Sequence, residues 1–206
     1  MLSRLVIAAA TAATVCTTGA VAAEWEPIEK IETYAIRGTS GIGLYRSIGE
    51  NGPGTGKGRA IAITDFSLKW SRDYRPRDGG CVLAAARPHL TIVYRLPRPA
   101  NKLPEDVQAL WDTFIRGVEA HERVHGRMII ETVKKIEAAT VGTFVPDDPG
   151  CRKVRKEVER RTVPIVEEQR RQSRAFDREE LSDGGNVHKL VLGLVNGLAA
   201  STEPLP

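Results

Sequence analysis

The longest regular pattern of apolar positions in this chain runs through residues 107–139. Apolar and aromatic side chains recur there three and four residues apart: Trp111, Phe114, Ile115, Val118 and Ile129. That spacing places them on one face of a helix. No proline interrupts the segment, and Pro104 followed by Glu105 suits a first helical turn. The pattern predicts one long helix over residues 104–139 that packs this face against a core.

Shorter stretches before this helix alternate between apolar and polar residues, as half-buried strands do. In the clearest of them, Leu90, Ile92 and Tyr94 share one face. Similar alternation predicts strands around residues 34–36 and 61–68, with a short amphipathic helix between them. The glycine-rich stretch GPGTGKG lacks two residues that a phosphate-binding loop needs, the leading glycine and the Ser or Thr after the lysine. We interpret it as a mobile loop.

The C-terminal third of the chain is mainly helical in pattern. A basic run over residues 152–162 ends before Pro164, and a second run over residues 165–174 carries on to Phe176 and Asp177. An apolar closing helix begins at Val187. The whole pattern predicts one α+β domain over residues 24–206. In it, a small antiparallel sheet packs on the long helix, and further helices follow at the C-terminus.

The first 23 residues have the character of a secretory signal peptide. One basic residue, Arg4, precedes a short run rich in small and apolar side chains that ends at Ala22 and Ala23. We therefore expect a periplasmic or secreted protein. No later stretch is long enough to span a bilayer, so we expect no integral membrane protein after cleavage. In an oxidising compartment the two remaining cysteines, Cys81 and Cys151, are predicted to form a disulfide.

The formal net charge of the 206 residues is only +4, and the basic residues concentrate between Arg152 and Arg178. Glutamates interleave with them, which is typical of a solvated helix face with local ion pairs. No aromatic side chains alternate with these basic residues until Phe176. The sequence therefore does not support a surface on which nucleobases could stack. We expect no nucleic-acid partner.

Two histidines continue the apolar stripe of the long helix. His121 and His125 are four residues apart, and Glu122 follows the first of them. Residues i and i+4 lie one turn apart on the same side of a helix, so the two imidazoles can hold one metal ion. The competing interpretation is a pair of core histidines, which is costly beside a glutamate unless every polar atom is paired.

The arrangement His-Glu-x-x-His suits zinc-dependent hydrolysis. Glu122 lies about 100° around the helix from His121, so it can flank the metal without binding it. Zinc lowers the pKa of bound water from about 16 to about 7, and a neighbouring carboxylate then acts as general base and later as general acid. We therefore expect a Zn2+ cofactor, with His121 and His125 as metal ligands and Glu122 as the catalytic residue.

Several stretches of the chain together resemble a known family. They are YAIRGTSGIGLYRSIGENGP, FSLKW, GGCVL, LTIVYRLP and WDTFIRGVEAHERVHG, which span most of the chain after the signal peptide. In these the chain resembles the bacterial predicted secreted zinc-dependent proteases, a family named as a domain of unknown function. The resemblance implies a small zincin-like metallopeptidase domain whose metal ligands match His121 and His125 and whose catalytic acid/base matches Glu122.

A catalytic zinc needs a third protein ligand. The family tends to carry a Tyr-Asp…Thr-x-His-Gly stretch near its C-terminus, where this chain has FDREELSDGG with no histidine. Asp183 is followed by a glycine and lies nearest to the family position, so it ranks first, ahead of His188. Glu131 ranks third, because on a continuing helix it lies about 240° around from His125.

The sequence therefore favours an exported zinc-dependent metallopeptidase that acts on a peptide or protein substrate. The alternative is a non-catalytic envelope binding protein that retains a degenerate metallopeptidase scaffold. The same chemistry would also hydrolyse a non-peptide amide, such as one in the cell wall. Neither the specific substrate nor the oligomeric state is encoded in a recognisable motif.

Overall fold

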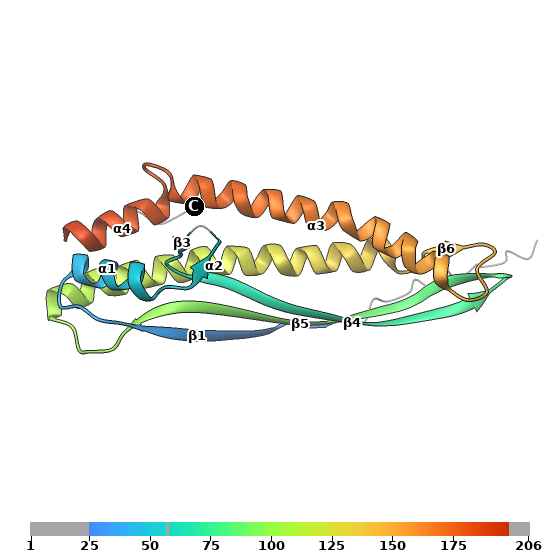
Figure 1. The fold of residues 1–206 in the computed structure, drawn as a ribbon, viewed down its shortest axis with the longest axis horizontal. Coiled ribbons are helices and arrows are strands. Elements are labelled where there is room, and N and C mark those ends of the chain that lie inside the picture. The colour runs from blue at the N-terminus through green and yellow to red at the C-terminus, as the bar shows by residue number, and fades with distance from the viewer. Residues whose placement is uncertain (1–24, 57, 198–206) are drawn as a thin grey trace, which may run out of the picture.

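The structure is a computed structural model that describes residues 25–56 and 58–197. The expected signal peptide at residues 1–23 lies outside these ranges. The elements in chain order are β1 (Ile28–Ile36), α1 (Gly41–Asn51), β2 (Gly54–Thr55), β3 (Gly58–Arg59), β4 (Ile63–Arg77), β5 (Gly80–Pro99), α2 (Glu105–Thr140), β6 (Phe144–Val145), α3 (Arg152–Leu181) and α4 (Asn186–Asn196). Figure 1 shows a long sheet beneath α2, with α3 running back above α2.

The predicted α+β class is confirmed, but the prediction of an antiparallel sheet is wrong in part. The sheet has the order β1-β5-β4, with β6 added to one end of β5. β4 and β5 form a long antiparallel hairpin, whereas β1 runs parallel to β5. The sheet is therefore mixed. β4 pairs with β5 alone among the described strands, so its other edge is free.

The main core lies between β5 and α2. From Ala86 to Leu96 the even-numbered residues of β5 are buried, and they include Leu90, Ile92 and Tyr94, as the alternation predicted. The apolar stripe of α2 packs on them through Trp111, Phe114 and neighbouring residues. The long helix is thus confirmed within one residue of its expected ends, and its stripe fixes which side of α2 faces the sheet.

The middle of α2 approaches the sheet unusually closely, and Gly126 makes this approach possible. A Cβ at this position would lie only 2.0 Å from Tyr94 Oη. Tyr94 donates a hydrogen bond to Glu29 on β1 at 2.7 Å, and Arg123 of α2 donates to the same carboxylate at 2.7 Å. These contacts fix the distance between α2 and the sheet, and the rotation of α2 about its axis, next to His121 and His125.

The basic region forms one continuous helix, α3, and the expected break at Pro164 is wrong. A proline removes one backbone hydrogen bond from the helix interior. Pro164 is exposed, so water can reach the carbonyl group that loses its partner. Only Val154 and Val158 are buried along the 30 residues of α3. Exposed ion pairs, such as Arg171 with Glu168, cover its outer face as the charge pattern predicted.

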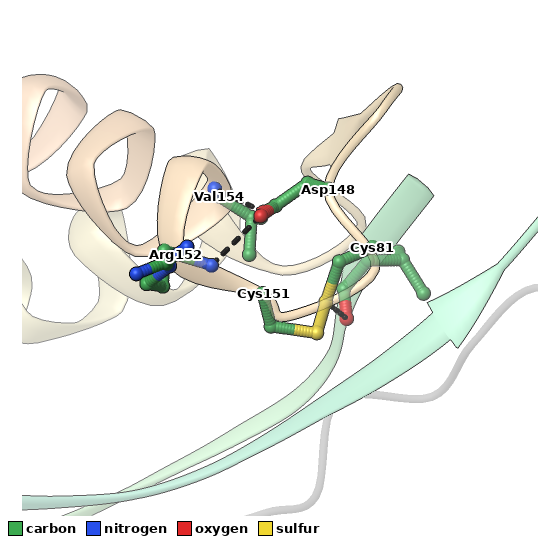
Figure 2. Close-up of a disulfide and its surroundings, with 6 residues drawn as sticks. Cys81, Asp148, Cys151, Arg152 and Val154 are labelled. Atoms are coloured by element: carbon green, nitrogen blue, oxygen red, sulfur yellow. Dashed lines mark hydrogen bonds between the residues drawn. A yellow bond between two sulfur atoms is a disulfide. The ribbon is translucent and has the colours of Figure 1, made fainter. Parts of the chain in front are cut away.

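A disulfide between Cys81 and Cys151 joins the tip of the β4–β5 hairpin to the start of α3, which confirms the predicted pairing (Figure 2). Asp148 accepts hydrogen bonds from the backbone N–H groups of Arg152 and Val154, each at 2.8 Å, and so caps the first turn of α3. The disulfide closes a loop of 70 residues. Chain-entropy theory values such a cross-link at about 4 kcal/mol.

The glycine-rich segment is not the loop that we expected. It forms the short antiparallel hairpin β2–β3, in which Gly54 pairs with Arg59 and Thr55 with Gly58. The closing helix α4 is confirmed, and it packs against both α1 and α2. None of the described helices is both long and apolar enough to cross a membrane.

The close approach at Gly126 predicts a specific energetic coupling. We expect G126A to lower the free energy of unfolding by about 1–3 kcal/mol, because the new methyl group overlaps the Tyr94 hydroxyl. In a Y94F background the same substitution should cost less, because the overlapping oxygen is gone. Urea unfolding of the four variants in a double-mutant cycle measures the difference.

Gly49 of α1 supplies the matched control, because nothing lies within 4 Å of a Cβ at that position. G49A should leave stability unchanged or raise it slightly, as expected for alanine in a helix. An equal cost of G126A with and without the Tyr94 hydroxyl would contradict the proposed close approach.

Candidate metal centre

The middle of α2 places His121, Glu122 and His125 on the wall of a cavity of about 550 Å³. His121 and Glu122 are buried, with 9% and 6% of their surfaces exposed. β4 contributes Thr64 and Phe66 to the cavity, while α3 and the β2–β3 hairpin supply other parts of its lining. The two imidazoles thus point away from bulk solvent, as their position on the apolar stripe predicted.

A carboxylate from α3 meets the two imidazoles. Asp177 Oδ1 lies 2.8 Å from His125 Nε2 and 3.4 Å from His121 Nε2, and the two Nε2 atoms are 3.2 Å apart. Among the described residues, these three form the one group of three or more His, Cys, Asp or Glu side chains whose ligand atoms lie close enough to bind a single metal ion. The donor atoms of two histidines from α2 and of one aspartate from α3 therefore lie close together around one point.

The other ring nitrogens of the two histidines face supporting groups on α3. His125 Nδ1 lies 3.0 Å from the Ser173 hydroxyl. His121 Nδ1 is buried without a hydrogen bond among the described residues, and Glu180 Oε2 lies 3.6 Å away. Ser173, Asp177 and Glu180 follow each other at helical spacing, so a single stripe of α3 supplies all these contacts.

Phe176 completes the stripe and orients the rings. Its side chain stacks on His121, with ring centroids 4.7 Å apart and planes 17° from parallel. It also meets His125 nearly edge-on, with centroids 5.4 Å apart. These contacts limit rotation of both imidazoles and keep each Nε2 directed at Asp177.

Glu122 is held from the opposite side by the sheet. The hydroxyl of Thr64 on β4 donates to Glu122 Oε2 at 2.6 Å and also lies 3.0 Å from the Glu122 carbonyl oxygen. Oε1 accepts no hydrogen bond from a described residue. The carboxylate is therefore fixed through one oxygen beside the histidines, while the other remains available to a ligand in the cavity.

The protonation of the cluster follows from its burial and its charges. Burial would lower the pKa of His121, but the carboxylates of Asp177, Glu122 and Glu180 outweigh this effect and raise it above its usual value. Burial would raise the pKa of Asp177, yet the two imidazoles hold it well below its usual range. For Glu122, burial raises the pKa despite the opposing hydrogen bond from Thr64.

The donor set fits a zinc ion. Ligand atoms about 2.0–2.1 Å from a tetrahedral Zn2+ lie about 3.3–3.4 Å from each other. Two of the three distances here, 3.2 and 3.4 Å, are close to that value, and the third is 2.8 Å. The unpartnered Nδ1 of His121 beside Glu180 also suits a histidine ligand, because metal-binding histidines commonly direct their second N–H towards a carboxylate.

The structure does not bring Asp183, our first choice for the third ligand, to this cluster. Its side chain is fully exposed in the loop before α4 and lies 3.9 Å from His188. His188 in turn accepts a hydrogen bond from the Gly184 N–H through Nδ1 and so helps to fix that loop. Glu131 is exposed on α2 and pairs with Lys134. Asp177, and not Asp183, lies beside the two imidazoles.

The predicted second helical run already reached Asp177, but Asp177 was not among the predicted ligands, because no local pattern shows that this part of α3 lies beside α2. The helical spacing of Ser173, Phe176, Asp177 and Glu180 on one stripe was the signal that could have found it. The family stretch beginning Tyr-Asp gave a second signal, since Phe176 and Asp177 match its first two positions. Asp183 was predicted instead because it lies nearest to the family's later His-Gly position and is followed by a glycine.

The fold and the site together define an α+β protein with a cluster of two histidines and an aspartate between two long helices. Comparison with known proteins identifies the family to which the chain belongs. Residues 31–185 match a bacterial protein family of unknown function, DUF922, and the chain belongs to this family. No curated protein and no solved structure matches the chain. The matched range includes all the residues of the cluster.

The two aspartates allow a direct comparison of metal binding. We expect D177A to weaken zinc binding by about two orders of magnitude or more, because it removes one of three donor atoms. D183A is the matched control and should bind zinc like the wild type, because its exposed carboxylate lies away from the cluster. Competition with a chromogenic chelator measures both affinities. Weaker binding in D183A alone would restore Asp183 as the ligand.

Proposed function

We propose that this protein is an exported zinc-dependent metallopeptidase. The observation that carries this proposal is the convergence of two imidazole nitrogens and the Asp177 carboxylate beside Glu122, which is not a member of the donor set. Three protein donors leave a fourth position for water or substrate in a tetrahedral site, as catalytic zinc requires. A closed structural site would use a fourth protein side chain.

The residues have separate roles in this proposal. Bound zinc would supply a Lewis acid and a water molecule with a pKa near 7. His121, His125 and Asp177 would hold the ion, while Ser173 and Glu180 contact the other ring nitrogens of the two histidines and orient them. Glu122 accepts a proton from the water at Oε1 and later delivers it to the leaving amine. Thr64 keeps the other carboxylate oxygen in place during both transfers.

The burial of Glu122 supports its assignment as general base and acid. A carboxylate that moves a proton in both directions works best when its pKa lies nearer to neutrality than that of a free glutamate. Burial shifts the pKa of Glu122 in that direction. In a solvated carboxylate on a helix surface, no such effect would be present.

The cavity and the disulfide support the rest of the proposal. A volume of about 550 Å³ lies within the usual range for small-molecule and substrate sites. The Cys81–Cys151 disulfide is compatible with an oxidising compartment, and therefore with export. Peptide bonds are the proposed substrate, and a cell-wall amide would undergo the same reaction.

The central test combines metal content with one conservative substitution. The chain from residue 24 onwards, purified without chelators, should contain about one zinc per molecule and should cleave peptides in a quenched-fluorescence library. E122Q should retain its zinc and its melting temperature but lose activity by a factor of about 100 or more, because an amide cannot accept the proton. Mass spectrometry for zinc, thermal unfolding and peptide cleavage give the three readouts.

Each outcome separates the alternatives. A zinc-free wild type that does not bind added zinc would rule out the metallopeptidase. Bound zinc without cleavage of any peptide or amide would favour the non-catalytic envelope binding protein. Undiminished cleavage by E122Q would remove Glu122 from the mechanism.

The hydrogen bond from Thr64 predicts a second effect on turnover. T64V has nearly the same shape as wild type but cannot donate to Glu122, so we expect kcat to fall by about tenfold or more while KM changes little. T64S retains the hydroxyl and should recover most of the activity. Steady-state kinetics on one cleaved peptide measures both parameters. A loss of activity in T64S with none in T64V would show that the methyl group matters and the hydrogen bond does not.

A further inference from the structure

The β2–β3 hairpin and the residues after it form part of the wall of the cavity that holds the metal centre, and Arg59 belongs to this wall. Thr55, Arg59 and Ala60 line the cavity together with Tyr45 of α1. Among the described lining residues, Arg59 is the one with a cationic side chain, and Glu122 and Asp177 are those with carboxylates. The cavity therefore combines a negative donor set with a separate positive group.

The position of this hairpin is set by a close backbone contact. Gly52 ends α1 by donating its N–H to the Ile48 carbonyl at 2.7 Å, and a Cβ on Gly52 would lie 2.3 Å from the Ala60 carbonyl oxygen. Ala60 N–H donates to the Pro53 carbonyl at 2.9 Å. These contacts hold the base of the hairpin against the end of α1, directly next to Arg59.

The guanidinium of Arg59 is oriented but not neutralised. Nη1 donates to the Gly52 carbonyl at 2.7 Å, and no described carboxylate forms an ion pair with Arg59. Most of its donors therefore remain for another partner. In contrast, Arg123 on the other side of α2 is engaged by Glu29 and Glu119. The two carboxylates of the cavity, Glu122 and Asp177, are committed to the metal centre.

We propose that Arg59 selects substrates that carry a carboxylate close to the bond to be cleaved. This inference rests on the proposed metallopeptidase function. A guanidinium presents paired N–H donors that match the two oxygens of a carboxylate, and such charge-assisted contacts are stronger than neutral ones. The carboxylate comes from one of two sources, the free C-terminus of a short peptide or an Asp or Glu side chain.

Apart from these charged groups, much of the cavity lining is apolar. Ile61, Val118, Leu181 and Val187 contribute to this lining. With a metal-bound group at one end and a carboxylate at Arg59, a ligand would have to place an uncharged segment across this apolar surface. The site thus favours a short peptide with one terminal or side-chain anion over a fully charged ligand.

Binding of zinc-chelating probes tests this selection without requiring turnover. Three probes carry an N-terminal hydroxamate on the same dipeptide scaffold: Ala-Ala with a free carboxylate, Ala-Ala amide and Asp-Ala amide. Isothermal titration calorimetry measures their affinity for the zinc-loaded chain from residue 24 onwards. We expect at least one carboxylate probe to bind about tenfold or more tightly than the amide, and the better of the two identifies the source of the anion.

Substitutions at two arginines test whether Arg59 causes the tighter binding of the carboxylate probe. R59Q should abolish the preference for the carboxylate probe, and R59K should retain part of it because the charge remains. R46Q is the matched control: Arg46 is exposed on α1, is not part of the cavity lining, and its replacement removes the same charge. The preference should persist in R46Q.

The outcomes separate this inference from the function on which it depends. If all three hydroxamates bind equally well, or if the preference survives in R59Q, the role of Arg59 is refuted while the metal centre stands. If no hydroxamate binds the zinc-loaded protein, the metallopeptidase proposal fails, and the selection by Arg59 fails with it.

Discussion

The burial of ionisable groups in the middle of α2 is the constraint on which the rest of the site depends. Removing His121 and Glu122 from water costs several kcal/mol unless partners compensate for the lost hydration. The partners come from outside the helix: Thr64 from the sheet, and Asp177 with Glu180 from α3. The polar cluster, together with Phe176 stacked on His121, therefore explains why α3 lies against α2 at this level, where none of the apolar residues of α3 is fully buried.

The sequence alone predicted the elements in which apolar residues recur at a regular spacing. The stripe of α2, the alternation in β5 and the two-cysteine link each followed from local spacing or from chemistry that needs no knowledge of the fold. The same is true of the inward direction of His121 and His125, because a residue on an apolar stripe shares the burial of its neighbours.

The sequence was insufficient where contacts between distant elements decide the outcome. Pro164 would end many helices, but its exposure on α3 lets the helix continue. That Asp177, and not Asp183, lies beside the two histidines depends on how α3 packs on α2. The direction of β1 beside β5 depends on how the chain crosses from one to the other, which the alternation of residues does not encode. The pairing of Thr64 with Glu122 joins residues 58 positions apart and has no local signature.

The sparse burial along α3 has a consequence for how such proteins diverge. Val154 and Val158 near its start, and a four-residue stripe near its end, carry its contacts with the core and the donor cluster. Natural selection can act weakly on the outward-facing positions between them, provided that the helix keeps its length and phase. Signatures based on contiguous residues would then find the histidines in related genomes and overlook their carboxylate partner.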